Sequence, residues 1–216
     1  MSGEPIRVYG IDPSLSSTGV ACVQVDETLP HGIWAWTEQL HVSARGCERI
    51  DEITRQLSVY ATANRVTLAV IEGPIYRTPK LRTADGERSP GLRGYHERAG
   101  LWWAIVCRLK RLGIPFAVAS PGSIKKYATN NGNAAKELML GRAIAVSPKI
   151  ASFDEADALF AALLGVHWLL GRATLVENTA YRADALAGVE WPTSGDALGW
   201  VSPLVAEALA GRRVAS

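Results

Sequence analysis

The sequence predicts an α/β fold, a mixed five-stranded sheet flanked by helices, in a single domain. Residues 66–71, Val-Thr-Leu-Ala-Val-Ile, are rich in β-branched side chains and have no polar face, which is typical of a strand buried on both sides. Helical spacing of apolar residues occurs before and after this strand. The chain has 216 residues, 48% of them hydrophobic, and is long enough for one domain with a large core.

Two antiparallel strands open the predicted fold. They are expected over residues 6–12 and 17–25, because only a short connection rich in Pro, Ser and Gly separates them. A third strand is predicted over residues 32–42 and a fifth over residues 114–119. Since a strand–helix–strand unit in one sheet is parallel and right-handed, the strand at 66–71 should lie beside the first strand.

Five helices complete the predicted fold. Four of them are expected over residues 47–64, 95–112, 121–127 and 134–146. The fifth begins after Ser152, because Ser152 and Glu155 have the spacing of a capping box. The many alanines of this last helix should allow it to lie close to the sheet.

Two segments do not follow the strand and helix patterns. Residues 73–94 are rich in Pro, Gly and Arg and lack periodicity, which predicts a long loop. The character of the sequence changes again after Gly171. We therefore predict a domain over residues 1–171 and a C-terminal extension of unassigned role over residues 172–216.

Composition argues against a membrane or secreted protein. The apolar runs are too short or too interrupted to span a bilayer, and the N-terminus lacks the basic flank and apolar block of a signal peptide. The cysteines Cys22, Cys47 and Cys107 lack metal-site spacing and are expected to be reduced thiols. These features predict a cytoplasmic protein without a membrane partner.

Positive charge is concentrated in two segments, although the net charge is only +2. Residues 77–98 contain six Lys or Arg residues, and residues 108–142 contain seven. A local basic surface of this kind suits a polyanionic partner such as nucleic acid. The alternative is a solvated helix face with basic residues in its last turn, which fits Arg108 to Arg111 well.

Two carboxylates stand at the ends of predicted strands. Asp12 closes the first strand, and Glu72 follows the strand at 66–71. Because parallel neighbours end at the same edge of a sheet, where ligands of open α/β sheets bind, Asp12 and Glu72 should lie side by side. The alternative is that Asp12-Pro13-Ser14 simply begins a turn, as Asp and Pro often do.

Two further carboxylates lie at the start of the last predicted helix. Asp154 and Asp157 are three residues apart, so they share a helix face. Acidic first turns are common without any catalytic role, because they interact favourably with the helix dipole. Asp157, however, interrupts an apolar helix on the side that must meet the sheet, and a buried carboxylate needs a partner there.

The four carboxylates define a candidate site for two Mg²⁺ ions, for which Mn²⁺ should be able to substitute. Converging carboxylates without His or Cys form a hard-oxygen site, which suits these ions better than zinc. Two ions about 3.5–4 Å apart form the clamp used for in-line phosphodiester hydrolysis. In that chemistry one ion activates the attacking water, and the other stabilises the leaving 3′ oxygen.

Five motifs follow one another in an order that is characteristic of a known family. They are Gly10-Ile11-Asp12-Pro13 with Thr18-Gly19, Val70-Ile71-Glu72-Gly73-Pro74, Glu97-Arg98-Ala99-Gly100-Leu101, Pro121 to Lys136 with Asn131-Gly132-Asn133-Ala134, and Asp154-Glu155-Ala156-Asp157-Ala158-Leu159. Over residues 6–170 the chain resembles the RuvC family of Holliday-junction resolvases, in bacterial or phage-type members, within the RNase H-like superfamily.

The resemblance implies an RNase H-like fold in which four carboxylates bind the catalytic metal ions. The implied catalytic and metal-binding residues are Asp12, Glu72, Asp154 and Asp157. It also implies a homodimer that places two sites on one four-way junction, in a bacterial or phage-infected cell. Lys125 and Lys136 would contact DNA near the cleaved phosphate. The full set of candidate DNA-binding residues is Tyr76, Arg77, Lys80, Arg82, Lys125, Lys126, Asn131 and Lys136.

The chain departs from the family in the loop after Glu72, which looks longer than in the bacterial enzymes. The family carries an aromatic residue in this loop that helps to distort the junction centre. Ile75 falls nearest to that position, with Tyr76 beside it. Tyr76 could stack on an unpaired base, a contact worth about 1–3 kcal/mol, or could pack under the loop instead.

The sequence therefore predicts a Mg²⁺-dependent, structure-selective endonuclease that cuts Holliday junctions or other branched DNA by paired nicks. The alternatives are an RNase H-like nuclease that acts on RNA or flap DNA, and a non-catalytic junction-binding protein. An actin-like or sugar-kinase ATPase is disfavoured, because those proteins need a glycine where Ser14 stands and usually a basic residue in the turn.

Overall fold

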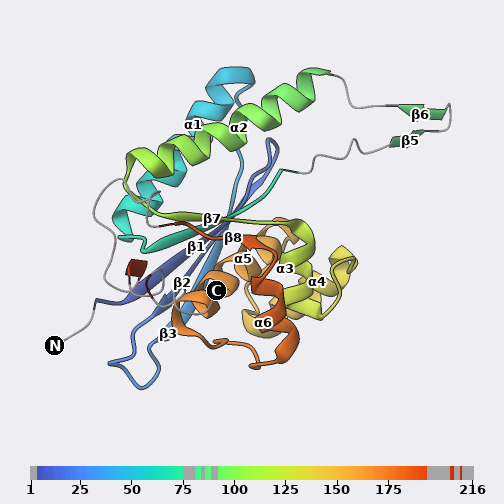
Figure 1. Cartoon of the computed structure of the whole chain (residues 1–216). Coiled ribbons are helices and arrows are strands. Elements are labelled where there is room, and N and C mark those ends of the chain that lie inside the picture. Colours follow the sequence, from blue (N-terminus) through green and yellow to red (C-terminus); the bar gives the residue numbers. More distant parts are fainter. Residues whose placement is uncertain are drawn as a thin grey trace.

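A six-stranded sheet forms the centre of the computed structural model, which describes residues 4–74, 81–83, 86–88, 92–193, 205, 206 and 210 (Figure 1). Its strands are β1 (Ile6–Asp12), β2 (Thr18–Val25), β3 (Ile33–Leu40), β4 (Leu68–Glu72), β7 (Phe116–Ala119) and β8 (Val189–Glu190). Their order across the sheet is β3-β2-β1-β4-β7-β8. A separate two-stranded sheet consists of β5 (Leu81–Thr83) and β6 (Gly86–Arg88).

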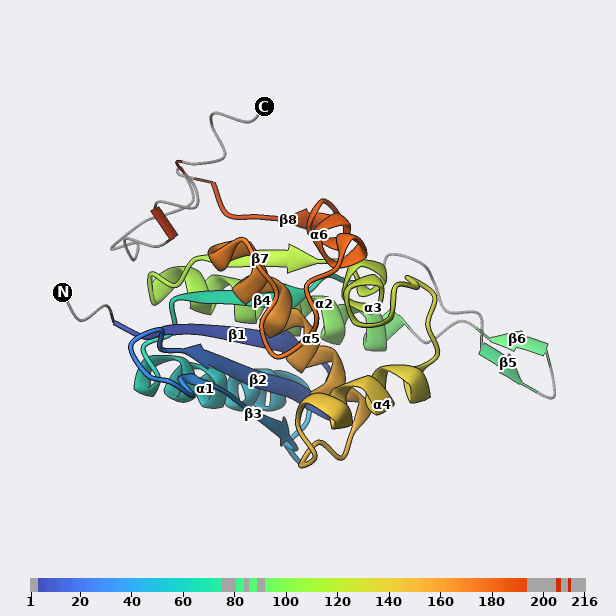
Figure 2. The same cartoon turned by 90° about the horizontal axis from the view of Figure 1, so that it is seen from below.

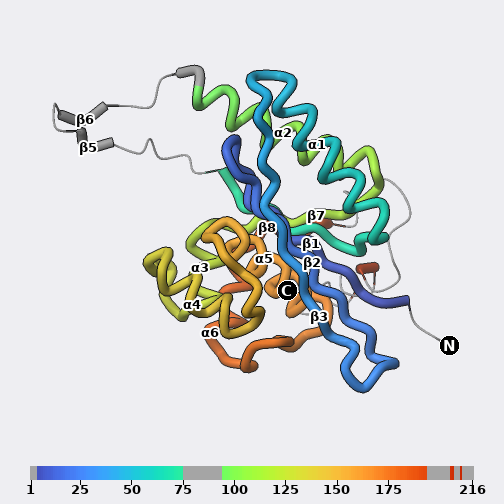
Figure 3. Tube along the Cα trace, turned by 180° about the vertical axis from the view of Figure 1, so that it is seen from behind, coloured from blue at the N-terminus to red at the C-terminus, as the bar shows by residue number. Residues whose placement is uncertain are grey.

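Helices cover both faces of the central sheet. They are α1 (Gly46–Ala63), α2 (Leu92–Arg111), α3 (Pro121–Thr129), α4 (Lys136–Val146), α5 (Phe153–Leu170) and α6 (Ala180–Leu186). Figures 1 and 2 show α1 and α2 on one face and α5 on the other, with α3, α4 and α6 gathered around α5. Figure 3 shows the same layers from behind, with β3 as an edge strand of the sheet.

Strand pairing follows the predicted directions. β1 pairs with β2 in antiparallel fashion, and β2 pairs with β3 in the same way. β4 lies parallel to β1 on its other side, and β7 lies parallel to β4. The predictions of an antiparallel opening pair and of a parallel neighbour for the first strand are therefore confirmed.

The predicted number of strands was wrong, because the sheet has six strands rather than five. The sixth strand is β8, which pairs in antiparallel fashion with the end of β7 through Glu190 with Val118 and Val189 with Ala119. A strand of two residues has no alternation for a sequence pattern to detect. It also comes from the segment predicted as a C-terminal extension. Within the predicted loop at 73–94, the structure places β5, β6 and the first turn of α2.

Two apolar cores flank the sheet, because successive side chains of a strand point to opposite faces. On one face, Tyr9 and Ile11 of β1 pack with residues of α1 and α2 such as Ile53 and Leu101. On the other face, Val8 belongs to a core that consists largely of α5 and includes the helices around it. β1 and β4 are thus buried from both sides, as the apolar strand at 66–71 predicted.

Helix α5 lies unusually close to the sheet, where two glycines leave room for it. A Cβ atom added to Gly10 would lie 1.8 Å from the carbonyl oxygen of Ala158. A Cβ atom added to Gly19 would lie 2.1 Å from the carbonyl oxygen of Asp154. Since those atoms belong to the backbone, only glycine fits at both positions. The first turns of α5 are therefore held against the ends of β1 and β2.

The predicted capping box begins α5. The Ser152 hydroxyl accepts a hydrogen bond from the amide of Glu155 at 3.2 Å and donates one to the Glu155 carboxylate at 2.9 Å. The same carboxylate accepts hydrogen bonds from the Thr37 hydroxyl at 2.8 Å and from the amide of Ala151 at 3.1 Å. The cap consequently also ties α5 to β3.

Within the described residues, no helix combines the length and apolar character needed to cross a bilayer. Cys22 is a buried free thiol, and Cys47 and Cys107 are exposed free thiols.

Candidate metal centre

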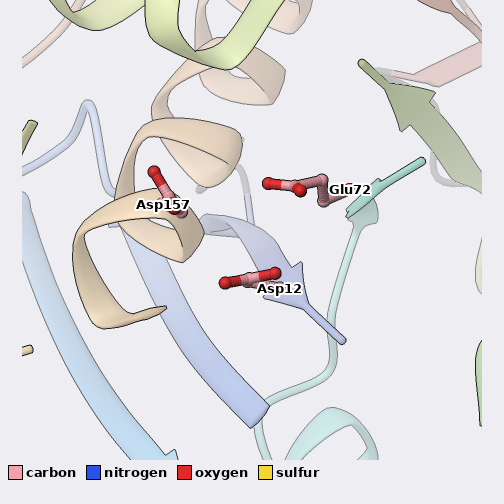
Figure 4. Close-up of side chains that lie close together, drawn as sticks. All are labelled: Asp12, Glu72 and Asp157. Carbon is pink, nitrogen blue, oxygen red and sulfur yellow. The ribbon is translucent and has the colours of Figure 1, made fainter. Parts of the chain in front are cut away.

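Three carboxylates from three different elements come together at one edge of the sheet. Asp12 ends β1, Glu72 ends β4 and Asp157 lies in the second turn of α5. Each offers an oxygen atom, and these three atoms all lie within 4.8 Å of one another (Figure 4). Asp12 and Glu72 are neighbours because β1 and β4 are parallel and Ile11 pairs with Ile71 directly before them.

The turn after Asp12 is fixed by one threonine. The hydroxyl of Thr18 donates a hydrogen bond to the carbonyl of Ser14 at 2.7 Å and accepts one from its amide at 3.3 Å. Asp12 itself pairs with Gly19 at the start of β2. Thr18 is fully buried, so these bonds hold the chain immediately beyond Asp12 in one conformation.

Glu72 is anchored on both sides of its strand. The amide that follows it, from Gly73, donates a hydrogen bond to the carbonyl of Ala119 on β7 at 2.8 Å. The carbonyl of Glu72 accepts a hydrogen bond from the indole nitrogen of Trp102 on α2 at 3.0 Å. No local pattern in the sequence indicates this contact, because Trp102 and Glu72 lie 30 residues apart in the chain.

Asp154, the fourth predicted carboxylate, lies outside this three-residue group. Its carboxylate accepts a hydrogen bond at 3.1 Å from the side-chain amide of Gln39 on β3. The carbonyl oxygen of the same Gln39 side chain lies 3.2 Å from Nε2 of His41. Gln39 was not predicted to be near the site. Thr37 and Gln39 are two residues apart, so they lie on the same face of β3, and both contact the first turn of α5. This spacing of polar residues is the sequence signal for the contact.

Burial makes the ionised forms of the three grouped carboxylates costly. Desolvation is the largest cause that raises the pKa of Asp12, followed by the nearby charges of Asp157 and Asp154. Desolvation also raises the pKa of Glu72, with Asp12 and Asp157 adding repulsion. The pKa of Asp157 is raised to about 6, again mainly by desolvation. Together the three groups behave as one crowded acidic site.

These properties fit a divalent cation. The group provides three hard oxygen donors and no His or Cys, which is the donor set that Mg²⁺ and Mn²⁺ prefer. Carboxylates that repel each other and have lost solvent are also those for which a cation would be the most favourable partner. Asp12, Glu72 and Asp157 are therefore the residues that could hold a metal ion.

Two lysines of the predicted DNA-binding set lie near the carboxylates. Lys125 on α3 and Lys136 at the start of α4 both lower the pKa values of Glu72 and Asp157, in opposition to burial. The ammonium group of Lys136 also lies 5.6 Å from the centre of the Phe153 ring. Both lysines thus supply positive charge at the edge of the sheet where the carboxylates converge.

The other candidate DNA-binding residues have different surroundings. Lys126 forms an ion pair with Asp184 of α6, with Nζ and Oδ2 separated by 3.9 Å. The side chain of Asn131 accepts a hydrogen bond from the amide of Asn133 at 2.9 Å and so shapes its own turn. The candidates that fall outside the described part of the chain are Tyr76, Arg77 and Lys80, together with the side chain of Arg82.

Comparison with solved structures identifies the fold. RuvC from Thermus thermophilus superposes with a TM-score of 0.58 and 22% sequence identity, covering 78% of this chain and 99% of that one. T. thermophilus RuvC in complex with a Holliday junction substrate gives the same TM-score with 18% identity, covering 73% of this chain and 90% of that one. No protein-family model and no curated protein matches the sequence.

The chain is an α/β protein with a mixed sheet and a group of three carboxylates at one edge of that sheet. Within that class its fold is RuvC-like, which confirms the resemblance predicted from the five motifs.

Proposed function

We propose that this protein is a structure-selective endonuclease that cuts Holliday junctions or related branched DNA by paired nicks. The observation that carries the proposal is the convergence of Asp12, Glu72 and Asp157 at the strand ends of a RuvC-like fold. At the strand ends, the acidic group lies near Lys125 and Lys136, which can bind the phosphates of DNA. The solved T. thermophilus RuvC complex with a Holliday junction substrate supports four-way DNA as the substrate class.

The proposed cofactor is Mg²⁺, two ions per site, with Mn²⁺ able to substitute. Bound ions would supply an activated water and charge stabilisation of the leaving oxygen. The chain itself holds the carboxylates: Thr18 fixes the turn beyond Asp12, and Trp102 fixes the backbone of Glu72. Asp154 is proposed as a further ligand, with Gln39 holding it beside the three-residue group.

The proposed contribution of Lys125 and Lys136 is to orient the DNA backbone at the carboxylates. Their charges already act on Glu72 and Asp157 across the site. Contacts of this kind are made to phosphates, so junction binding should weaken steeply with salt and should depend little on base sequence.

We further propose that two copies of the chain act together, because paired nicks need two sites. The exposed indole of Trp103 is a candidate contact between copies, since 61% of its surface is accessible on α2. It packs edge-on against Trp102, with 5.1 Å between ring centres. Tryptophan is enriched at protein–protein interfaces relative to the rest of the surface.

The test is cleavage of a labelled, mobile four-way junction beside matched linear and flap duplexes, in Mg²⁺ and then in EDTA. The proposal predicts symmetric nicks in the junction alone, lost when EDTA removes the metal. Cleavage of flaps, or of RNA in a matched hybrid, would replace it with an RNase H-like nuclease of other specificity. Tight junction binding without cutting in any metal would replace it with a non-catalytic binding protein.

A further inference from the structure

The α6–β8 segment, residues 180–191, packs directly against helix α3. β8 extends the sheet beyond β7, and β7 leads within one residue into α3. α6 lies beside α3, as Figure 2 shows. This segment belongs to the stretch of chain to which the sequence assigned no role.

One direct contact between the α6–β8 segment and α3 joins Ser123 and Gly188. The hydroxyl of Ser123 donates a hydrogen bond to the carbonyl of Gly188 at 3.0 Å. The same hydroxyl lies 2.8 Å from that of Ser120, the N-cap of α3. A Cβ atom added to Gly188 would lie only 2.5 Å from the Ser123 hydroxyl oxygen. A side chain at position 188 would therefore press on the first turn of α3.

Three further contacts hold α3 along its length. Asp184 forms the ion pair with Lys126. The buried guanidinium of Arg182 lies 5.8 Å from the ring centre of Tyr127 and donates a hydrogen bond to the carbonyl of Glu177 at 2.6 Å. The Tyr127 hydroxyl in turn donates to the carbonyl of Leu163 on α5 at 3.3 Å. α3 is thus fixed between the α6–β8 segment and α5.

Lys125 lies in the middle of this fixed helix. The start of α3 lies near the carboxylates, because Ala119 of β7 pairs with Glu72 and α3 begins after one further residue, at Pro121. The charge of Lys125 acts on Glu72 and Asp157 across the sheet edge. Lys125 lies on a different element from the three carboxylates of β1, β4 and α5, so a rotation of α3 would change its distance from them.

We propose that the α6–β8 segment sets the position of Lys125 by clamping α3, and that Ser123 and Gly188 are positioning residues for it. The role of Lys125 as a contact for the DNA backbone rests on the proposed function. The stabilisation of α3 by the α6–β8 segment can be measured without DNA.

The test uses Gly188→Ala, Ser123→Ala and the double variant, with Gly141→Ala as the matched control. An added Cβ at Gly141 meets nothing within 4 Å. In hydrogen exchange of the free protein, Gly188→Ala should speed exchange of the α3 amides about tenfold, because the clash weakens their local stability. The double variant should recover to the level of Ser123→Ala alone, because removing the Ser123 hydroxyl removes the clash together with the hydrogen bond to Gly188. Unchanged exchange in Gly188→Ala, or no recovery in the double variant, would overturn the clamp.

The second readout is single-turnover junction cleavage at saturating protein. Gly188→Ala should slow cleavage about tenfold, as expected when a positioned group is displaced by a fraction of an ångström to an ångström. The double variant should return to the rate of Ser123→Ala alone, and in a Lys125→Ala background Gly188→Ala should add no further loss. An additive loss in that background would overturn the link to Lys125. Absence of cleavage by the wild-type protein would overturn the proposed function, while the exchange result would still decide the clamp.

Discussion

The carboxylates of the site reach the edge of the sheet by two different routes. Asp12 and Glu72 are the last residues of neighbouring parallel strands, and backbone pairing fixes them side by side. Asp157 arrives on α5, whose position depends on tertiary packing over Gly10 and Gly19. The strand ends are thus specified by hydrogen bonding within the sheet, whereas the helix end is specified by the space left at two glycines.

The two aspartates at the start of α5 also differ in their surroundings. Asp154 and Asp157 are three residues apart on α5, yet only Asp157 joins the group with Asp12 and Glu72. Asp154 is instead bonded to Gln39 of the edge strand β3. Helical spacing decides which residues share a face, but the neighbouring elements decide what each of them contacts.

The largest expected effect is the loss of cleavage activity when a carboxylate is removed from a strand end or from α5. Asp12→Asn on the strand side and Asp157→Asn on the helix side should each slow junction cleavage by about a thousandfold, or about 4 kcal/mol, since each removes a ligand charge. Junction binding should remain within about threefold, because phosphate contacts supply the affinity. Single-turnover rates and gel-shift titrations measure both quantities. Cleavage by either variant at near the wild-type rate would remove that residue from the metal site.

The next largest effect is a loss of stability when the close packing of α5 over Gly10 is disturbed. Gly10→Ala places a Cβ atom 1.8 Å from the Ala158 carbonyl, so α5 must move away from the sheet. We expect a loss of about 3 kcal/mol in the free energy of unfolding, as for overpacked cores. Urea denaturation measures this, with Gly141→Ala as a control that should change stability by less than about 1 kcal/mol. Equal midpoints for the two variants would show that close packing over Gly10 does not constrain α5.

The smallest effect concerns charge at the strand ends in metal-free protein. Burial and the neighbouring Asp12 and Asp157 raise the pKa of Glu72 from 4.5 to about 9. A carboxyl group with a raised folded-state pKa stabilises the fold fully below its unfolded-state pKa, and this contribution disappears as the pH rises through the folded-state value. Wild-type protein in EDTA should therefore lose stability between about pH 4.5 and 9.

Glu72→Gln should remove this loss, because the glutamine side chain has no charge to desolvate. At pH 8 in EDTA we expect the variant to unfold at higher temperature than the wild type, by about 1–3 kcal/mol in free energy, and the difference should fade towards pH 4.5. Added Mg²⁺ should stabilise the wild type more than the variant. A variant less stable than the wild type at pH 8 would show that the ionised carboxylate is not costly in the empty site.

The placement of Asp12 and Glu72 at neighbouring strand ends could be predicted from the sequence. An apolar run followed by an acidic residue occurs at both Asp12 and Glu72, and the handedness of strand–helix–strand units places the two strands together. The capping box at Ser152 and Glu155 was equally local and equally readable. These features depend on few residues that are close in sequence or on a general rule of sheet topology.

The rest depends on contacts between distant parts of the chain. The hydrogen bond from Gln39 to Asp154, the one from Trp102 to Glu72, and the ion pair of Lys126 with Asp184 each join elements whose relative placement no local pattern determines. β8 was missed for another reason, because two residues are too few to show a period. The sixth strand exists through pairing with the end of β7 rather than through its own sequence.

The packing of α5 over β1 also has a consequence for the order in which the protein is assembled. β1 begins at Ile6, whereas the helix that covers it begins at Phe153, so contacts of very long sequence separation close the core. Folding of such a chain is slowed by the entropy of closing long loops. During synthesis, strands β1, β2 and β4 must wait without cover on one face until α5 emerges. The acidic group can form only after α5 has emerged, so a nascent chain that ends before α5 lacks the three-carboxylate group.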